Sequence, residues 1–227
     1  MHLGGGHVSY LTQIDYISTA RANKAAVFNK QSVQLRYRHS DADLTTVLKH
    51  HVLIMCLRFR IHNAARIYTL DAVFGLELYE LLSADPEFEA RLSRPTPDTQ
   101  LGTSNASSLR IRVDQANAWD ADYFISIHTN ASSLPAATGS EALVYTDPSV
   151  AASLATDILR ELNIATGLRN RGVLERPGLY VLRRTEMPAV LVELGFISNA
   201  GDAELMNNRP DLFALGIYRG IRDYLGL

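Results

Sequence analysis

Cysteine is almost absent from this chain of 227 residues, since Cys56 is the only one. A single cysteine excludes an internal disulfide and a zinc site built from several cysteines. No stretch reaches the roughly 18 consecutive apolar residues that a membrane-spanning helix requires, and the apolar run at residues 52–57 is far shorter. We therefore expect a protein without a membrane span, in which Cys56 is an inert buried thiol.

A strong charge of either sign is also missing. The 22 lysines and arginines nearly balance the 24 aspartates and glutamates, which leaves a net charge of −2. This balance gives no electrostatic reason to expect nucleic acid as a partner. Apolar residues make up 47% of the chain and charged residues 20%, which is ordinary for a soluble globular protein with a sizeable core.

The first residues show no signal peptide. Residues 1–6 read Met-His-Leu-Gly-Gly-Gly and carry neither a basic region nor an apolar region. Three interpretations stay open: an export signal has been removed from the sequence, the protein leaves the cell by another route, or it stays inside.

The chain divides into an irregular segment, residues 1–63, and a regular one, residues 64–227. The first segment shows no firm periodicity beyond a short buried strand at residues 52–57. In the second segment helical and strand patterns alternate, which predicts a single α/β domain with a mostly parallel central sheet and helices on both faces. The expected helices are 64–82, 108–119, 148–162, 199–207 and 210–225, and the expected strands are 88–92, 122–128, 141–145, 179–182 and 189–193.

Two of the expected strands end in residues that can carry chemistry. Residues 122–128 form an apolar run that ends at His128, and residues 189–193 read Ala-Val-Leu-Val-Glu and end at Glu193. Ligands bind at the carboxyl ends of strands in open α/β sheets, so both side chains are candidates for a site there.

Each of the two residues has a structural and a functional interpretation. His128 is either a satisfied histidine at a strand end or a metal ligand, and Ser126 and Asn130 flank it with groups that could orient it. Glu193 is either a charge at a helix entry beside Asn199 or a general base whose pKa is raised by its apolar surroundings.

These residues fall within an ordered set of motifs that resembles a known family. The set includes Arg-Val-Asp-Gln-Ala-Asn at 112–117, Ser-Ile-His-Thr-Asn-Ala at 126–131, Gly-Ser-Glu at 139–141, Arg-Gly-Val at 171–173, Leu-Tyr-Val-Leu-Arg at 179–183 and Met-Pro-Ala-Val-Leu-Val-Glu-Leu-Gly-Phe-Ile-Ser-Asn at 187–199. From about residue 67 to the C-terminus, the chain is similar to the zinc-dependent N-acetylmuramoyl-L-alanine amidases of type 3 (amidase_3).

The resemblance implies a reaction and a set of residue roles. The reaction is hydrolysis of the amide bond between N-acetylmuramic acid and L-alanine in peptidoglycan, by a water that one Zn²⁺ activates. His128 matches a zinc ligand, and Glu193 matches the catalytic glutamate that moves the water's proton to the leaving amine. Glu141 matches an acidic residue that lines the cleft, although a surface carboxylate at a strand edge is an equal alternative.

The chain departs from the family pattern before residue 67. The first histidine ligand would fall near His50 or His51, which lack the expected glycines, while His62 and His7 lie elsewhere. The glutamate ligand would fall at Ala65. Residues 1–63 are therefore a divergent or inserted segment that still supplies ligands, a degenerate segment, or a foreign or out-of-frame segment.

The resemblance also sets expectations about the whole protein. We expect a peptidoglycan hydrolase that acts as a monomer at the bacterial cell wall, outside the cell or in the periplasm. The alternative is a catalytically impaired relative that binds peptidoglycan or regulates other hydrolases. A metallopeptidase of related fold that cuts free peptides is a third alternative.

Overall fold

The computed structural model describes residues 50–56, 64–96 and 99–227, and all of them belong to one compact unit. These residues form one sheet of six strands in the order β2-β1-β3-β6-β4-β5. The strands are β1 (His50–Cys56), β2 (Phe88–Leu92), β3 (Tyr123–Asn130), β4 (Ser140–Val144), β5 (Asn170–Glu175) and β6 (Ala189–Phe196). The strand β1 lies inside this sheet, between β2 and β3, although residues 1–63 were set apart on sequence grounds.

The sheet is parallel over most of its width. The strands β2, β1, β3 and β6 run in one direction, whereas β4 is antiparallel to β6 and β5 is parallel to β4. The predicted α/β class with a mostly parallel sheet is thus confirmed. The reversal at β4 was not predicted, because alternating helical and strand patterns do not show which way a strand enters the sheet.

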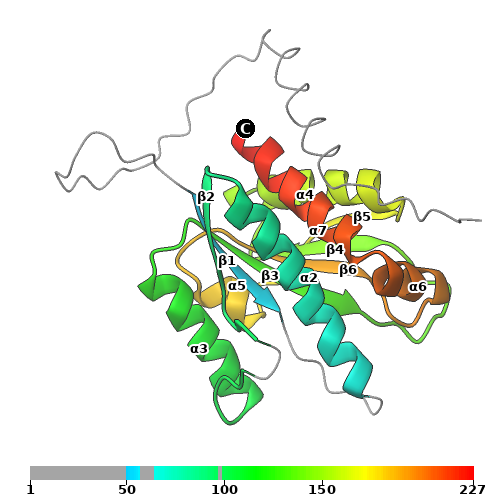
Figure 1. Ribbon diagram of the computed structural model, residues 1–227, viewed down its shortest axis with the longest axis horizontal. Helices are drawn as coiled ribbons and strands as arrows, with labels where there is room; N and C mark the ends of the chain where they lie inside the picture. Colours follow the sequence, from blue (N-terminus) through cyan, green and yellow to red (C-terminus); the bar gives the residue numbers. More distant parts are fainter. Residues whose placement is uncertain (1–49, 57–63, 97–98) are drawn as a thin grey trace, which may run out of the picture. The chain divides into compact units, whose positions relative to one another are not determined.

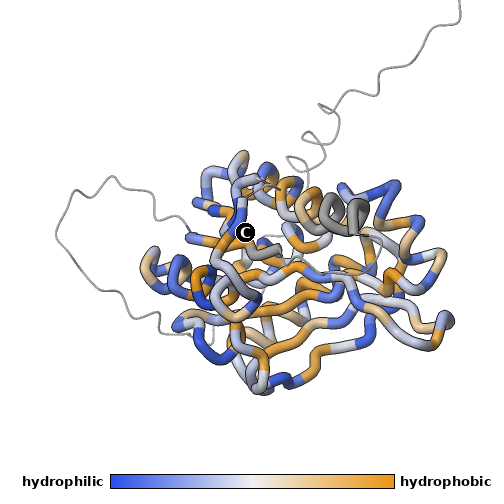
Figure 2. The backbone as a smooth tube through the Cα atoms, turned by 90° about the horizontal axis from the view of Figure 1, so that it is seen from below, coloured by the Kyte–Doolittle hydropathy of each residue, from blue (hydrophilic) through white to orange (hydrophobic). Residues whose placement is uncertain are grey.

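Helices cover both faces of the sheet (Figure 1). One face carries α2 (Ala64–Ala84), α4 (Val150–Thr166) and α7 (Pro210–Leu225), and the other carries α3 (Asn105–Ala118) and α5 (Tyr180–Arg184). The short helix α6 (Ala200–Asn208) follows directly after β6. Figure 2 shows apolar segments running through the strands in the middle of the unit, with hydrophilic residues concentrated in the loops around them.

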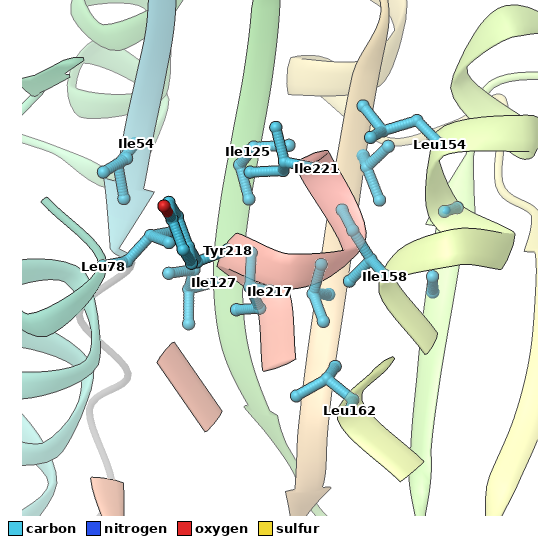
Figure 3. Packing of buried hydrophobic residues seen from close by; sticks show 14 of the residues in the cluster. Ile54, Leu78, Ile125, Ile127, Leu154, Ile158, Leu162, Ile217, Tyr218 and Ile221 are labelled. Carbon is cyan, nitrogen blue, oxygen red and sulfur yellow. The ribbon is translucent and has the colours of Figure 1, made fainter. Parts of the chain in front are cut away.

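The larger core lies under α2, α4 and α7. Every second residue of β3 and β6 points into it, so that Ile125 and Ile127 meet aliphatic side chains from all three helices (Figure 3). The intervening residues of the same strands point to the smaller core under α3 and α5, where Phe124 and Leu191 are buried. His128 and Glu193 continue this second series, which places both on the face that α3 and α5 cover.

Two predictions about local structure were wrong. Residues 179–182 were expected to form a strand, but Tyr180–Arg184 form the helix α5. A run of four apolar residues does not distinguish a strand from a short buried helix. The second error is a missed strand, because β5 comes from the polar stretch 166–177; an edge strand with exposed residues needs no apolar alternation.

The other elements lie close to their predicted ranges. The helix expected from residue 148 begins at Val150, because the Ser149 hydroxyl accepts a hydrogen bond from the Ala152 N–H and fixes the helix start there. The last helix begins at Pro210 and ends at Leu225, as expected. In α7, Gly216 and Gly220 face α4 so closely that an added Cβ would lie 2.8 Å from the Leu162 Cα and 2.3 Å from the Ile158 Cα.

Candidate active site

Three strands place His128, Glu193 and Glu141 side by side across the sheet. His128 in β3 is the register partner of Glu193 in β6, and Glu193 is in turn the register partner of Glu141 in β4. His128 and Glu193 lie toward the carboxyl ends of their strands. Because β4 runs in the opposite direction, Glu141 reaches the same edge of the sheet from the start of its strand.

His128 is buried and held by a neighbour on its own strand. Only 4% of the residue is exposed, and its Nε2 lies 2.7 Å from the Ser126 hydroxyl oxygen. Burial, with a smaller effect of the Arg112 cation, lowers the pKa of His128 from 6.5 to about 3. The imidazole is therefore neutral at pH 7, which is the form that binds metal ions.

Glu193 has the opposite electrostatic shift. Burial, and then the negative charge of Glu141, raise its pKa from 4.5 to about 7. Its Oε2 atom is buried and has no hydrogen-bond partner within the described part of the chain. A carboxyl group that titrates near neutral pH can accept a proton and release it again under physiological conditions.

Glu141 is ion-paired, unlike Glu193. Its Oε1 accepts a hydrogen bond of 2.9 Å from the Asn130 side-chain amide, and its Oε2 accepts one of 2.8 Å from the Arg171 Nε. Each carboxylate oxygen thus accepts a hydrogen bond, so Glu141 is fixed in place between two polar side chains. The fixed negative charge one strand away is what Glu193 experiences.

The structure brings only some of the sequence candidates to this edge. His50 and His51 lie at the start of β1, and the register pairs Val52 with Tyr123, whereas His128 lies toward the end of the neighbouring β3. By this register His51 lies opposite residue 122, which is six residues before His128 along the strand, a distance of about 20 Å. His50 and His51 are therefore excluded as partners of His128. His7 and His62 lie outside the described residues.

Other residues around the site were missed as functional candidates. Arg112 in α3 is 2% exposed and donates a hydrogen bond of 3.1 Å from its Nη1 to the Ser93 hydroxyl. A signal for it was present, since Arg112 shares the helical spacing of Leu109, Val113 and Ala116 and so lies on the buried face. Arg171 lies in the missed strand β5; the motif Arg-Gly-Val at 171–173 marked it as part of the resemblance, but no role was assigned to it.

The donor groups of the described residues supply only part of a metal site. In the ranges that the structure describes, no group of three or more histidine, cysteine, aspartate or glutamate side chains could hold a metal ion. A catalytic zinc site needs three protein ligands and one open position. The described residues offer a neutral histidine beside an unpartnered carboxylate oxygen, which is only part of such a site.

Taken together, the fold and the site define an α/β domain with a histidine and a titratable glutamate at the carboxyl edge of its sheet. The model of the family Amidase_3, N-acetylmuramoyl-L-alanine amidase, matches residues 67–223, a range that contains all three site residues. The chain therefore belongs to the N-acetylmuramoyl-L-alanine amidase family, as its motifs indicated.

Curated relatives agree with this assignment. The chain is 41% identical to N-acetylmuramoyl-L-alanine amidase CwlM of Bacillus licheniformis over 116 residues. This aligned region covers 50% of this chain and 43% of that protein. It is 39% identical over 121 residues to N-acetylmuramoyl-L-alanine amidase LytC of Bacillus subtilis, which covers 52% of this chain and 24% of that protein. The chain thus spans less than half the length of either relative.

Solved structures share the fold. The catalytic domain of the amidase CwlV from Bacillus (Paenibacillus) polymyxa superposes with a TM-score of 0.65 at 29% identity, over 79% of this chain and 99% of that one. The CwlD amidase from Clostridioides difficile superposes with a TM-score of 0.71 at 23% identity, over 78% of this chain and 99% of that one. Among the described residues, no helix is both long and apolar enough to cross a membrane.

Proposed function

We propose that this protein hydrolyses the amide bond between N-acetylmuramic acid and L-alanine in peptidoglycan, and that it acts at the bacterial cell wall. The observation that carries the proposal is the register pairing of His128 with Glu193 in a chain of the amidase family. The pairing brings a neutral imidazole and a carboxyl group with a pKa of about 7 to one edge of the sheet.

The proposal assigns a role to each residue. Glu193 accepts a proton from the attacking water; as the C–N bond breaks, it gives that proton to the amine of L-alanine. Its raised pKa suits both halves of this transfer. Glu141 lines the cleft and, with its charge held by Asn130 and Arg171, keeps the pKa of Glu193 high.

We also propose that His128 is a ligand of one Zn²⁺. When bound, zinc lowers the pKa of a coordinated water and polarises the scissile carbonyl. The neutral state of His128 at pH 7 supports this role. Because the described residues do not complete three ligands, the remaining ligands have to come from outside them.

That incomplete ligand set also favours a second candidate. A relative that binds peptidoglycan without cutting it, or that regulates other hydrolases, needs the fold and the cleft but no complete zinc site. The two candidates differ in metal content and in the product that is formed.

Zinc content and product release distinguish the hydrolase from the relative that only binds or regulates. Protein purified without added metal should contain about one zinc per chain and should release new N-terminal L-alanine from cell-wall sacculi. The Glu193→Gln variant should keep its zinc and lose at least about 100-fold in rate, because it cannot accept the proton. Glu204→Gln, which changes an exposed glutamate on α6, is the matched control and should retain activity.

Absence of both zinc and product, with binding to sacculi retained, would overturn the hydrolase and support the second candidate. Cleavage of free peptides without cleavage of sacculi would instead indicate a peptidase of related fold.

A further inference from the structure

The strand β6 contains a bulge directly after Glu193. His128 pairs with Glu193 and Asn130 pairs with Phe196, so β6 has one more residue than β3 between these two pairs. An extra residue in one strand breaks the ladder locally and redirects the side chains around it. The bulge can therefore determine how the side chain of Glu193 is oriented.

The redirection is visible at Phe196. On a regular strand, residues three apart point to opposite faces of the sheet. Here the ring of Phe196 lies 5.0 Å from the guanidinium of Arg171, which is bonded to Glu141, the register neighbour of Glu193. The bulge thus turns Phe196 toward the side of the sheet that carries the two glutamates.

Two side chains bind the backbone groups that the bulge releases from the ladder. The Ser140 hydroxyl donates a hydrogen bond of 2.6 Å to the Leu194 carbonyl oxygen, and the Phe196 N–H donates one of 2.9 Å to the Asp202 Oδ2. Both side chains are 2% exposed. Neither hydrogen bond can be replaced by water without opening the fold.

Asp202 connects the bulge to a second segment. Its Oδ2 also accepts a hydrogen bond of 3.1 Å from the Gly139 N–H, and its Oδ1 accepts one of 2.5 Å from the Thr138 hydroxyl. Residues 138 and 139 lead directly into β4, which carries Glu141. One buried carboxylate therefore fixes the chain next to both glutamates of the candidate site.

We propose that Asp202 is a positioning residue for Glu193: through its hydrogen bonds to Phe196, Gly139 and Thr138 it holds the β6 bulge and the entry to β4, and so fixes the aim of the Glu193 carboxyl group. The catalytic part of this inference rests on the proposed amidase function. The structural part, the dependence of the Glu193 environment on Asp202, does not.

The test compares Asp202→Asn with Asp85→Asn. Asp85 is a matched control, because it is 8% exposed and its carboxylate accepts hydrogen bonds from the Glu87 N–H, the Tyr218 hydroxyl and Arg222. It joins the end of α2 to α7 on the opposite face of the sheet from the site. Both changes replace a buried acceptor oxygen by an NH₂ group, so both should lower the melting temperature.

Only Asp202→Asn should change catalysis. A misplacement of about 1 Å costs on the order of 100-fold in rate, so we expect kcat on sacculi to fall about 10- to 100-fold with KM nearly unchanged. Asp85→Asn should keep kcat within about twofold of the wild type when both are assayed below their melting temperatures. An equal decrease in kcat in Asp202→Asn and Asp85→Asn would overturn the proposal.

A second measurement does not depend on activity. The ¹³C signal of the Glu193 carboxyl group, assigned by its loss in Glu193→Gln, should shift in Asp202→Asn and stay in place in Asp85→Asn at one fixed pH. If the wild type has no activity on sacculi, the proposed function fails, and this signal alone decides the positioning role. An unshifted signal in Asp202→Asn would refute it.

If Asp202→Asn does not fold, Ser140→Ala takes its place. This change removes the hydrogen bond to the Leu194 carbonyl without altering any charge. Ser140→Ala should then have the effects expected of Asp202→Asn, namely a lower kcat, an unchanged KM and a shifted ¹³C signal of the Glu193 carboxyl group. Wild-type values for both kcat and the ¹³C signal would show that the bulge does not orient the Glu193 side chain.

Discussion

Glu193 and Glu141 show how far the surroundings of a residue decide its chemistry. They are register partners on adjacent strands, yet Glu141 has a hydrogen bond to each oxygen whereas the Oε2 of Glu193 has none within the described residues. Glu141 forms an ion pair with Arg171, whereas burial, and then the negative charge of Glu141, raise the pKa of Glu193. Two identical side chains thus have different surroundings, and only in Glu193 does a carboxylate oxygen lack a hydrogen-bond partner within the described residues.

The pKa of Glu193 predicts a dependence of stability on pH in metal-free protein. Between its ordinary value of 4.5 and about 7, the folded protein keeps the proton that the unfolded chain has already lost. The folded state therefore binds more protons, and the free energy of unfolding falls as pH rises through this window. The decrease should approach about 3 kcal/mol and level off above neutral pH.

Urea unfolding of wild type and Glu193→Gln between pH 4.5 and pH 8, the latter about one unit above the pKa, measures this effect. Because glutamine does not titrate, the variant should gain stability relative to the wild type by about 3 kcal/mol across the range. Glu204→Gln should follow the wild-type curve. Parallel curves for wild type and Glu193→Gln would contradict a raised pKa.

At the scale of helices and strands, prediction from sequence succeeded where burial imposes a helical period or a continuous apolar run of strand length. The helices α2 and α7 were predicted because their apolar residues follow helical spacing, and the strands β3 and β6 because each is a short continuous apolar run with β-branched residues. The helix α5 and the strand β5 were not, because a short apolar run is ambiguous and an edge strand has few buried residues. The bulge in β6 was also beyond prediction, since it depends on Asp202 and Ser140, which are distant in sequence from each other.

The contact between α4 and α7 gives a prediction at this scale. Gly220→Ala would place a Cβ 2.3 Å from the Ile158 Cα, so the two helices must move apart. Overpacking of this kind costs about 1–3 kcal/mol, which should outweigh the gain of about 1 kcal/mol in helix propensity. Thermal or urea unfolding should show a net loss of stability.

The matched substitution is Gly201→Ala in α6. Its added Cβ would meet only the Asn199 Oδ1, at an ordinary distance of 3.4 Å, and the position is exposed. We expect stability to stay the same or to rise by less than about 1 kcal/mol. A Gly220→Ala protein as stable as Gly201→Ala would mean that the helices separate at no cost.

At the scale of the whole described unit, the direction of the strands decides which histidines belong to the site. The sequence could place His128 and Glu193 at strand ends, and the parallel pairing of β3 with β6 then brings them together. It could not place His50 and His51, because their position depends on where β1 starts. They lie at the start of β1, and the ring centroids of His51 and Trp119 are 5.1 Å apart, with the rings tilted by 35°.

The positions of the two histidines at opposite ends of the sheet predict different effects of their substitution on zinc content and activity. His128→Ala should lose bound zinc and activity together, because it removes a proposed ligand. His51→Ala should keep both, since His51 lies about 20 Å from the level of His128. Metal analysis of the purified variants is the measurement. Loss of zinc from His51→Ala with His128→Ala unaffected would place the metal at the other end of the sheet.

The strand order has a consequence for how the protein is made. The strand β6 lies between β3 and β4, although it follows both in the sequence, so the segment 131–139 spans the gap in which β6 later docks. Until Phe196 has left the ribosome, β3 and β4 each expose an unpaired inner edge, which is a surface prone to aggregation. Because Glu193 belongs to the last strand of this sheet, the candidate site is completed only after residue 193 has been synthesised. A chain terminated before residue 193 therefore lacks the proposed catalytic carboxyl group together with the strand that joins β3 to β4.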